Sequence, residues 1–343
     1  MSPVAAQGEP VDVMVFGAGA IGLWVGGMLA QSGLRVHFVA RAGTVGALRA
    51  RGLKLYPLDG AERTVAPDSL SASESLDEAP QARLMLLTVK GTATREAAEA
   101  IERSHLAGTP LISFQNGVDN PGRVRAASPR TPVLAGMVPY NVIIPEPGTV
   151  RQASDGRLMC ARDAVSESWT AAFARAGIPL DLRDDMAAVQ WGKLLLNLNN
   201  PVNALTGLPL REQLLDRRCR KILAGLQREA LDAMGRAGIR PARVTPLPTH
   251  WLPAFLSAPN AIFVPLATRM LRIRPDARSS MYDDRVAGRA TEIDDLCGAV
   301  IRLAESTGLD APLNRRMRSL VLESEPGRFY APEALARALH DAA

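Results

Sequence analysis

The chain has 343 residues, a net charge of +5 at pH 7 and a hydrophobic content of 47%. That length favours two domains over one hydrophobic core. No charge-free apolar run reaches the roughly 18 residues of a membrane span, and the polar start lacks the basic and apolar segments of a signal peptide. We therefore expect a cytoplasmic protein in which residues 1–10 form a flexible tail.

The charged residues and cysteines point to neither a nucleic-acid partner nor a metal. The arginines are spread along the chain with acidic residues between them, which is typical of a solvated surface. Cys160, Cys219 and Cys297 are far apart and lack the paired spacing of a zinc site. We therefore expect no metal, no nucleic-acid partner and no membrane partner.

The first predicted element is a strand over residues 11–16, which runs into Gly17-Ala18-Gly19-Ala20-Ile21-Gly22 and an apolar helix. In such a unit Gly17 permits the tight turn, Gly19 leaves room for a pyrophosphate, and Gly22 lets the helix pack against the strand. The phosphates bind N–H groups at the positive end of the helix. A second strand over residues 35–40 follows at βαβ spacing, which favours dinucleotide binding over a plain glycine-rich turn.

The residues after the second strand indicate which dinucleotide binds. NAD sites usually place Asp or Glu there, whereas this chain has Ala40 and Arg41. A guanidinium at this position suits the 2′-phosphate of NADP through charge-assisted hydrogen bonds. The alternative is a solvated arginine in an arginine-rich chain. We predict NADPH as the cofactor, with Arg41 as a contact.

Further strands are predicted over residues 82–89 and 110–114, and polar residues follow each of them. Lys90 follows the first strand and Asn116 the second. In a doubly wound sheet, ligands bind at the carboxyl ends of the strands. A lysine that reaches solvent and a plain Asn-Gly turn are the alternatives. Closely spaced strands between residues 133 and 159 predict an antiparallel extension of the sheet. A helix near residues 166–176 and a strand over 179–182 complete the Rossmann-type α/β domain that we expect over 11–183.

From about residue 184 helical periodicity replaces the strand signals. This pattern predicts an all-helical domain over 184–343, whose apolar content is compatible with a homodimer. The polar residues described below lead us to expect that this domain binds substrate. A proline-rich connector is expected over residues 241–265. The helices are predicted over residues 186–204, 211–237, 283–306 and 313–322.

One face of the first of these helices is polar. Lys193, Asn197 and Asn200 fall within a narrow arc, while leucines cover the other sides. Such a stripe on a buried helix is costly unless it meets a polar ligand. Lysine, of which the chain has only four, can exchange a proton where arginine cannot. The alternative is a polar seam satisfied by neighbouring backbone groups.

A second polar cluster comprises Ser279-Ser280-Met281, Asp284 and Thr291-Glu292-Ile293-Asp294. Taken alone, a serine before a helix is an N-cap and a glutamate on a helix is a solvated carboxylate. Neither motif by itself indicates a function.

Together these motifs resemble the ketopantoate reductase (2-dehydropantoate 2-reductase) family, from Val11 to about Glu325. The resemblance implies NADPH-dependent reduction of ketopantoate to pantoate, a step in pantothenate and coenzyme A synthesis. The matching motifs are the glycine loop with Arg41, Lys90, Gln115-Asn116-Gly117, Trp191-x-Lys193-x-x-x-Asn197, Ser279-Ser280-Met281 with Asp284, and Thr291-Glu292-Ile293-Asp294.

The resemblance also implies roles. The family's general acid matches Lys193, its substrate contacts match Glu292 and Ser280, and Asn116 matches a residue beside the nicotinamide. An ammonium stabilises the negative charge that grows on a carbonyl oxygen and then protonates it, and a nearby carboxylate keeps the ammonium charged. We expect substrate contacts from Asn116, Asn197, Asn200 and Ser280. We expect cofactor contacts from Gly17, Ala18, Gly19, Ala20, Ile21, Gly22, Arg41, Lys90, Asn116 and Glu292.

One departure from the family lies in the residues after Lys193. The family often has a second asparagine eight residues after the lysine and then a proline, whereas here Pro201 already holds the eighth position. The second asparagine role therefore stays open among Asn199, Asn200 and Asn203. The alternatives to a ketopantoate reductase are a paralogous reductase of another small 2-keto acid and a non-catalytic NADP-binding redox sensor.

Overall fold

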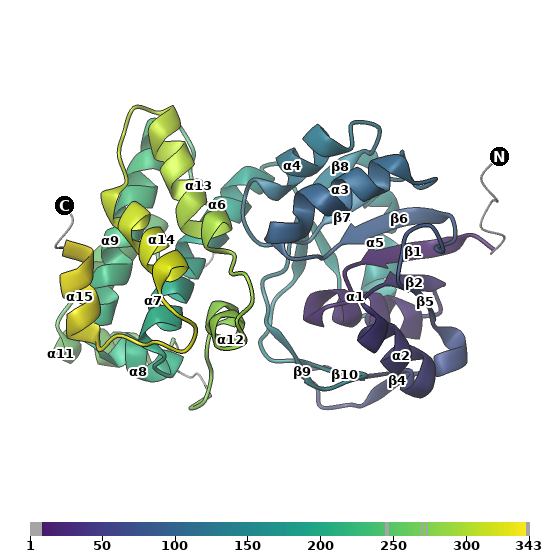
Figure 1. Cartoon of the computed structure of the whole chain (residues 1–343), viewed down its shortest axis with the longest axis horizontal. Helices are drawn as coiled ribbons and strands as arrows, with labels where there is room; N and C mark the ends of the chain where they lie inside the picture. The colour runs from purple at the N-terminus through teal and green to yellow at the C-terminus, as the bar shows by residue number, and fades with distance from the viewer. Residues whose placement is uncertain (1–8, 244–246, 269, 272–273, 341–343) are drawn as a thin grey trace. The chain divides into compact units, whose positions relative to one another are not determined.

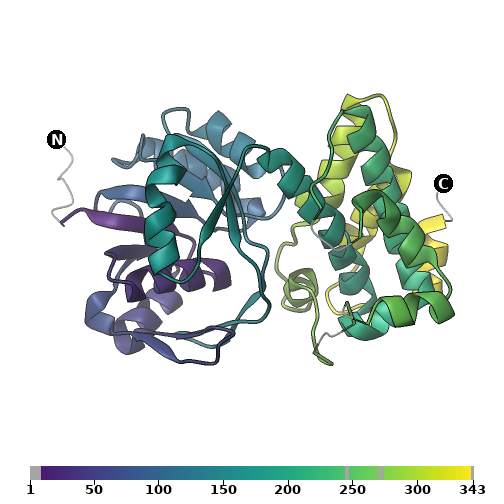
Figure 2. The same cartoon turned by 180° about the vertical axis from the view of Figure 1, so that it is seen from behind.

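The structure is a computed structural model that describes residues 9–243, 247–268, 270–271 and 274–340. Most of the predicted tail, residues 1–8, lies outside the described residues. The chain divides between Met186 and Ala187 into two compact units. Figures 1 and 2 show a first unit built on β-sheets, purple to teal, and a second unit built of helices, teal to yellow. The predicted fold class, a Rossmann-type sheet domain followed by a helical domain, is confirmed.

Eight strands form the main sheet of the first unit. They are β1 (Val11–Phe16), β2 (Val36–Val39), β5 (Ser71–Ser73), β6 (Ala82–Leu87), β7 (Leu111–Ser113), β8 (Val133–Met137), β11 (Leu158–Ala161) and β12 (Leu180–Arg183). Their spatial order is β12-β11-β8-β7-β6-β1-β2-β5. All neighbours from β5 to β8 are parallel, and only the β8–β11 pair is antiparallel. The order reverses between β1 and β6, as in a doubly wound dinucleotide-binding sheet.

Side chains of the central strands point alternately to the two faces of the sheet, and each face packs against a layer of helices. Val13 and Val15 of β1 belong to the core shared with α1 (Ala20–Gln31) and α5 (Ala164–Arg175). Met14 belongs to the core shared with α3 (Thr94–Arg103) and α4 (Asn120–Ala127). The period of two along a strand sends neighbours to opposite faces, so both faces of the sheet are covered, as Figure 1 shows.

A second, four-stranded sheet covers the other side of α1. It has the order β4-β3-β10-β9, and its strands are β3 (Leu53–Tyr56), β4 (Arg63–Val65), β9 (Val142–Glu146) and β10 (Thr149–Gln152). Two adjacent glycines let α1 approach both sheets. An added Cβ would lie 2.6 Å from the Phe38 ring at Gly26 and 2.4 Å from Leu53 at Gly27. The predicted extension of the main sheet is therefore wrong for β9 and β10, because they pair with each other and with β3.

The second unit is helical. Its helices are α6 (Met186–Asn197), α7 (Asn199–Thr206), α8 (Leu210–Leu215), α9 (Arg217–Arg236), α10 (Leu252–Ser257), α11 (Asn260–Leu266), α12 (Ser280–Val286), α13 (Ile293–Ser306), α14 (Pro312–Glu323) and α15 (Pro332–His340). The remaining short elements are α2 (Ala42–Arg51), η1 (Pro67–Ser69), η2 (Gly91–Ala93) and η3 (Thr249–Trp251). The proline-rich segment expected as a connector contains α10 and α11, and its residues 244–246 lie outside the described residues.

Three of the predicted long helices are each two shorter ones. The helix expected over 186–204 breaks at Leu198, because Pro201 has no N–H to donate to the carbonyl four residues earlier. The helix expected over 211–237 breaks at Asp216, whose carboxylate caps α9 by accepting from the backbone N–H of Arg218. The helix expected over 283–306 is interrupted between Val286 and Ile293. These breaks place polar residues at helix ends.

Buried arginines donate hydrogen bonds to backbone carbonyl groups at many of these helix ends. The Arg220 guanidinium, 1% exposed, donates to the carbonyl oxygens of Leu214 at 2.8 Å and Leu256 at 2.9 Å. Arg285 donates to the carbonyl oxygen of Ala204 at 2.7 Å. Each guanidinium therefore ties several helix termini together.

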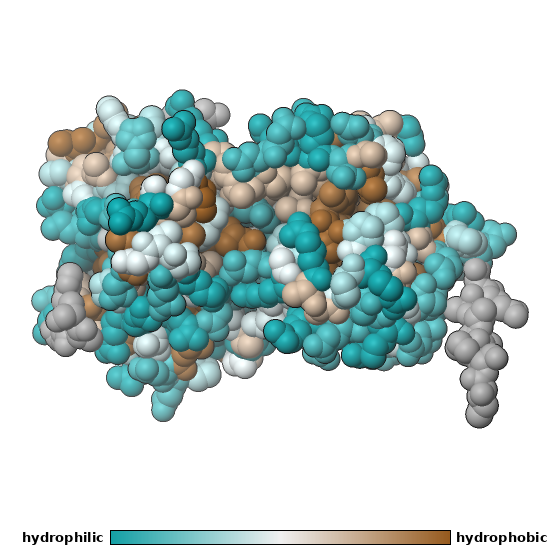
Figure 3. Space-filling view, turned by 90° about the horizontal axis from the view of Figure 1, so that it is seen from above, coloured by the Kyte–Doolittle hydropathy of each residue, from teal (hydrophilic) through white to brown (hydrophobic). Residues whose placement is uncertain are grey.

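Hydrophilic residues cover most of the face shown in Figure 3, and apolar residues gather there in small patches. Within the described part of the chain, no helix is both long and apolar enough to cross a membrane. The described residues also contain no cluster of His, Cys, Asp or Glu that could hold a metal ion.

Candidate active site

The register of the main sheet aligns the carboxyl ends of four strands. Phe16 of β1 lies opposite Val39 of β2 and Leu87 of β6, and Leu87 lies opposite Ser113 of β7. Because these parallel strands end side by side, the residues that follow them lie at the same edge of the sheet. These residues are the glycine loop, Arg41, Lys90 and Asn116. The structure thus brings the predicted cofactor residues of the first unit to one edge.

The three glycines of the loop differ in what surrounds them. Gly17 has a φ of +103°, and an added Cβ would lie 2.5 Å from the backbone nitrogen of Val89. At Gly22 an added Cβ would lie 2.3 Å from the Gly17 carbonyl oxygen and 2.6 Å from Thr88 Oγ1. Apart from its two chain neighbours, no described residue has an atom within 4 Å of a Cβ added at Gly19. Gly17 and Gly22 are therefore needed by the fold, while Gly19 faces the open space that a pyrophosphate requires.

The start of α1 is suited to an anion. Gly19 is its N-cap residue, and no side chain caps this end. Ala20 and Ile21 form the first turn, and Ala18 is buried just before it. The uncapped N–H groups of a first helical turn, with the helix dipole, form a binding site for phosphate.

Arg41 occupies the equivalent point after β2. It is the N-cap residue of α2 and its side chain is exposed. The first turn of α2 contains no acidic residue. Among the residues that the structure describes, no carboxylate forms an ion pair with Arg41. A cation at a helix N-terminus without a competing carboxylate suits a phosphate group.

Gln115 forms a buried hydrogen-bond network that the sequence analysis did not predict, since it named this residue only as part of a motif. It is 6% exposed and lies between β7 and the loop after β6. Its side-chain oxygen accepts from Ser113 Oγ at 2.9 Å, and its Nε2 donates to the Val89 carbonyl at 3.0 Å and to Thr94 Oγ1 at 2.7 Å. This buried network fixes the loop that contains Lys90, which is exposed.

Asn120 extends the network to Asn116. Thr94 Oγ1 donates to Asn120 Oδ1 at 2.9 Å, and Asn120 Nδ2 donates to the Asn116 carbonyl at 2.5 Å. The segment is also a turn, because Gly117 has a φ of +88°. Sequence reasoning missed Thr94 and Asn120. The available signal was a polar residue at the first position of two consecutive helices, Thr94 of α3 and Asn120 of α4.

The second unit contains the predicted acid–base pair. Lys193 lies on α6 and is half-buried. Burial lowers the pKa of Lys193 to about 8, and the negative charge of Glu292 opposes this by raising it. Glu292 was expected within a helix, which is wrong: it is the N-cap residue of α13, and its side chain does not cap that helix. An ammonium with a pKa near neutrality, close to a carboxylate, is suited to general acid catalysis.

The asparagines that follow Lys193 separate into two groups. Asn203 is fully buried, and its Nδ2 donates to the Leu208 carbonyl and to Gln213 Oε1, both at 2.8 Å. Asn199 Oδ1 accepts from Gln213 Nε2 at 2.6 Å. Both side chains are therefore engaged in holding α7 to α8. Asn197, which ends α6, and Asn200 on α7 are half-buried.

The two serines at the start of α12 also differ. Ser279 is the N-cap residue, and its Oγ accepts from the backbone N–H of Tyr282 at 3.2 Å. Its own N–H donates to Asn203 Oδ1 at 2.9 Å, and its Oγ donates to the Asn200 carbonyl at 3.4 Å. Ser280 is the first residue of α12 and is exposed. The structure thus brings Ser280 close to the segment that contains Asn200.

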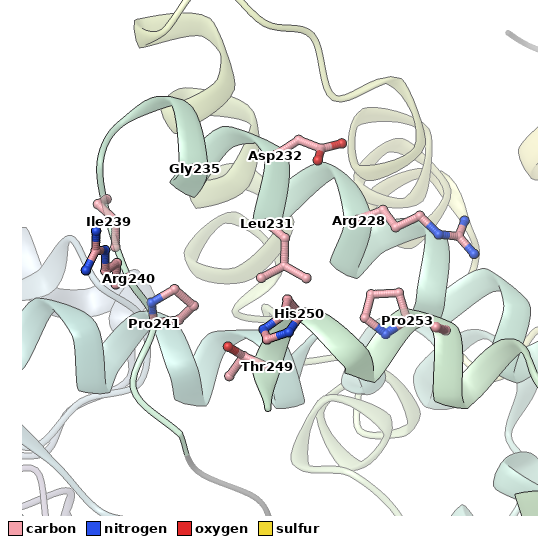
Figure 4. A pocket seen from close by; sticks show the side chains of 11 residues that line it. Arg228, Leu231, Asp232, Gly235, Ile239, Arg240, Pro241, Thr249, His250 and Pro253 are labelled. Carbon is pink, nitrogen blue, oxygen red and sulfur yellow. The ribbon is translucent and has the colours of Figure 1, made fainter. Parts of the chain in front are cut away.

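A cavity of about 760 Å³ lies elsewhere in the second unit. Figure 4 shows Arg228, Leu231 and Asp232 of α9 on one side and His250 on another. None of the predicted site residues lines it. Its size alone therefore does not make it the candidate active site.

Comparisons with known proteins identify the family of this chain. Residues 13–162 match the ketopantoate reductase PanE/ApbA family, and residues 185–325 match the C-terminal domain of that family. A 2-dehydropantoate 2-reductase of Pyrococcus horikoshii is 25% identical over 327 residues, which are 92% of this chain and 98% of that protein.

Two solved structures have the same fold. A PanE/ApbA family ketopantoate reductase from Ralstonia eutropha JMP134 is 29% identical with a TM-score of 0.78, over 91% of this chain and 97% of that one. D-mandelate dehydrogenase, solved with NADH and anilino(oxo)acetate, is 20% identical with a TM-score of 0.75 over 91% of this chain and 97% of that one. With both halves matched by one family, this chain belongs to the ketopantoate reductase PanE/ApbA family of oxidoreductases.

Proposed function

We propose that the protein reduces ketopantoate to pantoate with NADPH. The observation that supports this most is Lys193, whose pKa is lowered to about 8 by burial and is influenced by Glu292. A proton donor of that strength is what the reduction of a ketone to an alcohol requires at neutral pH. Relatives named 2-dehydropantoate 2-reductase are similar to this chain over almost their full length.

The first unit fits a nicotinamide dinucleotide. The space beside Gly19 and the uncapped start of α1 suit the pyrophosphate. Arg41 suits the 2′-phosphate of NADPH, because an exposed guanidinium can donate two parallel hydrogen bonds to it. When bound, the dihydronicotinamide supplies the hydride. Lys90 and Asn116, at the ends of β6 and β7, are proposed to orient the nicotinamide half.

The second unit would supply the proton. As the carbonyl oxygen of the substrate gains negative charge, the ammonium of Lys193 donates a hydrogen bond to it and then transfers its proton. The carboxylate of Glu292 favours the charged form of Lys193 before the transfer. Glu292 can also accept a hydrogen bond from the substrate's own hydroxyl group.

The substrate carboxylate needs neutral donors. Asn197, Asn200 and Ser280 are proposed for this role, because they are half-buried or exposed while Asn199 and Asn203 are engaged in internal hydrogen bonds. Among the three asparagines left open by the sequence, we therefore assign the substrate role to Asn200. The earlier proline coincides with the break between α6 and α7 at Leu198, which changes the direction of the residues after Asn197.

The test is NADPH oxidation at 340 nm with ketopantoate, beside NADH and a panel of other small 2-keto acids. We expect saturable oxidation that is fastest with ketopantoate and NADPH. Oxidation with another acid alone would identify a paralogous reductase. NADPH binding without turnover of any acid would contradict the proposal and favour a redox sensor.

A further inference from the structure

The buried hydrogen-bond network of the first unit joins the loops after β6 and β7, and its members have no role in the proposed reaction. They are the side chains of Ser113, Gln115, Thr94 and Asn120, which are between 0% and 6% exposed. Thr94 begins α3 and Asn120 begins α4, and these two helices pack side by side on one face of the sheet (Figure 1). Because its members are too deeply buried to touch a ligand, the network can act on the reaction only through the residues that it holds.

Thr94 is the link between the two halves of the network. Its Oγ1 accepts a hydrogen bond from Gln115 Nε2 at 2.7 Å and donates one to Asn120 Oδ1 at 2.9 Å. A hydroxyl can accept and donate at once, whereas an amide nitrogen only donates and an amide oxygen only accepts. A side chain of the same shape without a hydroxyl would therefore disconnect Gln115 from Asn120.

Both ends of the network hold the backbone of a loop. Gln115 Nε2 also donates to the carbonyl oxygen of Val89, the residue directly before Lys90, at 3.0 Å. Asn120 Nδ2 donates to the carbonyl oxygen of Asn116 at 2.5 Å. The network thus fixes the positions of the Lys90 loop and of Asn116 relative to each other.

The order of the strands assigns these two loops to one half of the dinucleotide. In the order β7-β6-β1-β2, the glycine loop after β1 lies between Arg41, which follows β2, and the loops after β6 and β7. A dinucleotide binds across such a switch point with its pyrophosphate at the glycine loop. In the proposed function Arg41 holds the 2′-phosphate, so the nicotinamide half extends over the ends of β6 and β7.

We propose that Thr94 and Asn120 are positioning residues, which fix the place of the nicotinamide ring by holding the Lys90 loop and Asn116 together. This proposal rests on the proposed function, because it takes the nicotinamide to bind beside Asn116. Hydride transfer depends steeply on the geometry of the reacting atoms, so a small shift of these loops slows the reaction more than it weakens cofactor binding. The adenine half, on the other side of the glycine loop, is not affected.

The test compares two ligands of the full-length protein: NADPH, and 2′-phospho-ADP-ribose, a fragment of it without the nicotinamide. Thr94→Val replaces the hydroxyl by a methyl group of similar size. We expect this variant to raise the Kd for NADPH about fivefold and to lower kcat with ketopantoate about 10- to 100-fold, while the Kd for the fragment stays within about twofold. Thr94→Ser keeps the hydroxyl and should have wild-type values.

A second variant and a control separate positioning from stability. Asn120→Asp keeps the shape and an acceptor oxygen but loses the donor to the Asn116 carbonyl, so it should act like Thr94→Val. Ser128→Ala is the control, because Ser128 is fully buried at the other end of α4, where it bonds to Glu102 and Thr131. The control should lower the Tm and leave kcat and both Kd values unchanged.

The outcome depends on which values change together. The proposal is overturned if Thr94→Val and Asn120→Asp raise the Kd for NADPH and for the fragment by the same factor, or if both variants leave kcat and the Kd for NADPH unchanged. A wild-type protein that binds NADPH and reduces no keto acid would contradict the proposed function instead. In that case the two Kd values would still test the positioning role.

Discussion

The hydroxyl of Thr88 donates a 2.6 Å hydrogen bond to the carbonyl oxygen of Gly17, and so joins the loop after β6 to the glycine loop after β1. This contact leaves no room for a side chain at Gly22, where an added Cβ would lie 2.6 Å from the Thr88 oxygen. We expect Gly22→Ala to destabilise the protein by about 1 to 3 kcal/mol, because the backbone must shift. Thermal unfolding measures this loss. An unchanged Tm would contradict the packing argument.

Gly19→Ala should weaken NADPH binding and leave the stability unchanged, unlike Gly22→Ala. Apart from the two chain neighbours, no described residue has an atom within 4 Å of the added methyl group. The Tm should therefore be unchanged while the Kd for NADPH rises about tenfold or more. Gly46→Ala is the matched control, since that glycine on α2 also has open space around it. The control should gain about 0.4 to 1 kcal/mol of stability and bind NADPH normally. Normal NADPH binding by Gly19→Ala would count against the pyrophosphate assignment.

Arg41→Ala should discriminate between the two nicotinamide cofactors. If the guanidinium binds the 2′-phosphate, its loss should raise the KM for NADPH by about 10- to 100-fold, which corresponds to one or two charge-assisted hydrogen bonds. The KM for NADH should change little. Arg51→Ala, an exposed arginine at the other end of α2, provides the control. If the KM values for NADPH and NADH rose by similar factors, Arg41 would not be a contact of the 2′-phosphate.

Glu292→Gln should move the pH profile of the reaction. Protonated Lys193 is the active form, so kcat/KM for reduction should fall about tenfold per pH unit above a pKa of about 8. The charge of Glu292 raises that pKa, so removing the charge should shift the alkaline limb toward lower pH. Glu305→Gln, an exposed acid of α13 that pairs with Arg315, should leave the limb in place. A limb that moves to higher pH in Glu292→Gln would contradict the pairing.

Asn200→Ala and Asn203→Ala should separate substrate binding from stability. Asn200→Ala should raise the KM for the keto acid about fivefold with little change in Tm, because it removes one donor to the substrate. Asn203→Ala should cost about 2 to 4 kcal/mol of stability, since it leaves buried partners on Ser279, Leu208 and Gln213 unpaired. The reverse pattern would assign the substrate role to Asn203.

Much of the first unit could be predicted because its signals are local. The strand over residues 11–16, the glycine loop and the helix after it follow each other without interruption, and the structure has all three there. The shared edge for Arg41, Lys90 and Asn116 follows from the parallel register alone. The second sheet could not be predicted in this way, because β3 pairs with β10, far along the chain.

The helical unit was harder to predict, because the apolar periodicity continues across the residues at which the helices break. Pro201 indicates an interruption of the helix near Asn197, but Leu198 continues the leucine pattern of α6, so the sequence does not place the break at that residue. The choice among Asn199, Asn200 and Asn203 depends on which side chains meet Gln213 and Ser279, and those contacts come from other helices. The buried partners of Gln115 were hidden for the same reason.

Lys193→Ala tests the central claim most directly when NADPH binding and turnover are measured on the same sample. We predict an unchanged Kd for NADPH, a loss of about 10² to 10⁴ in kcat with ketopantoate, and partial recovery when a small primary amine such as ethylamine is added. Lys54→Ala, an exposed lysine of β3, should behave as the wild type. If Lys193→Ala kept wild-type turnover while Lys54→Ala did the same, Lys193 would not be the proton donor and the account would fail.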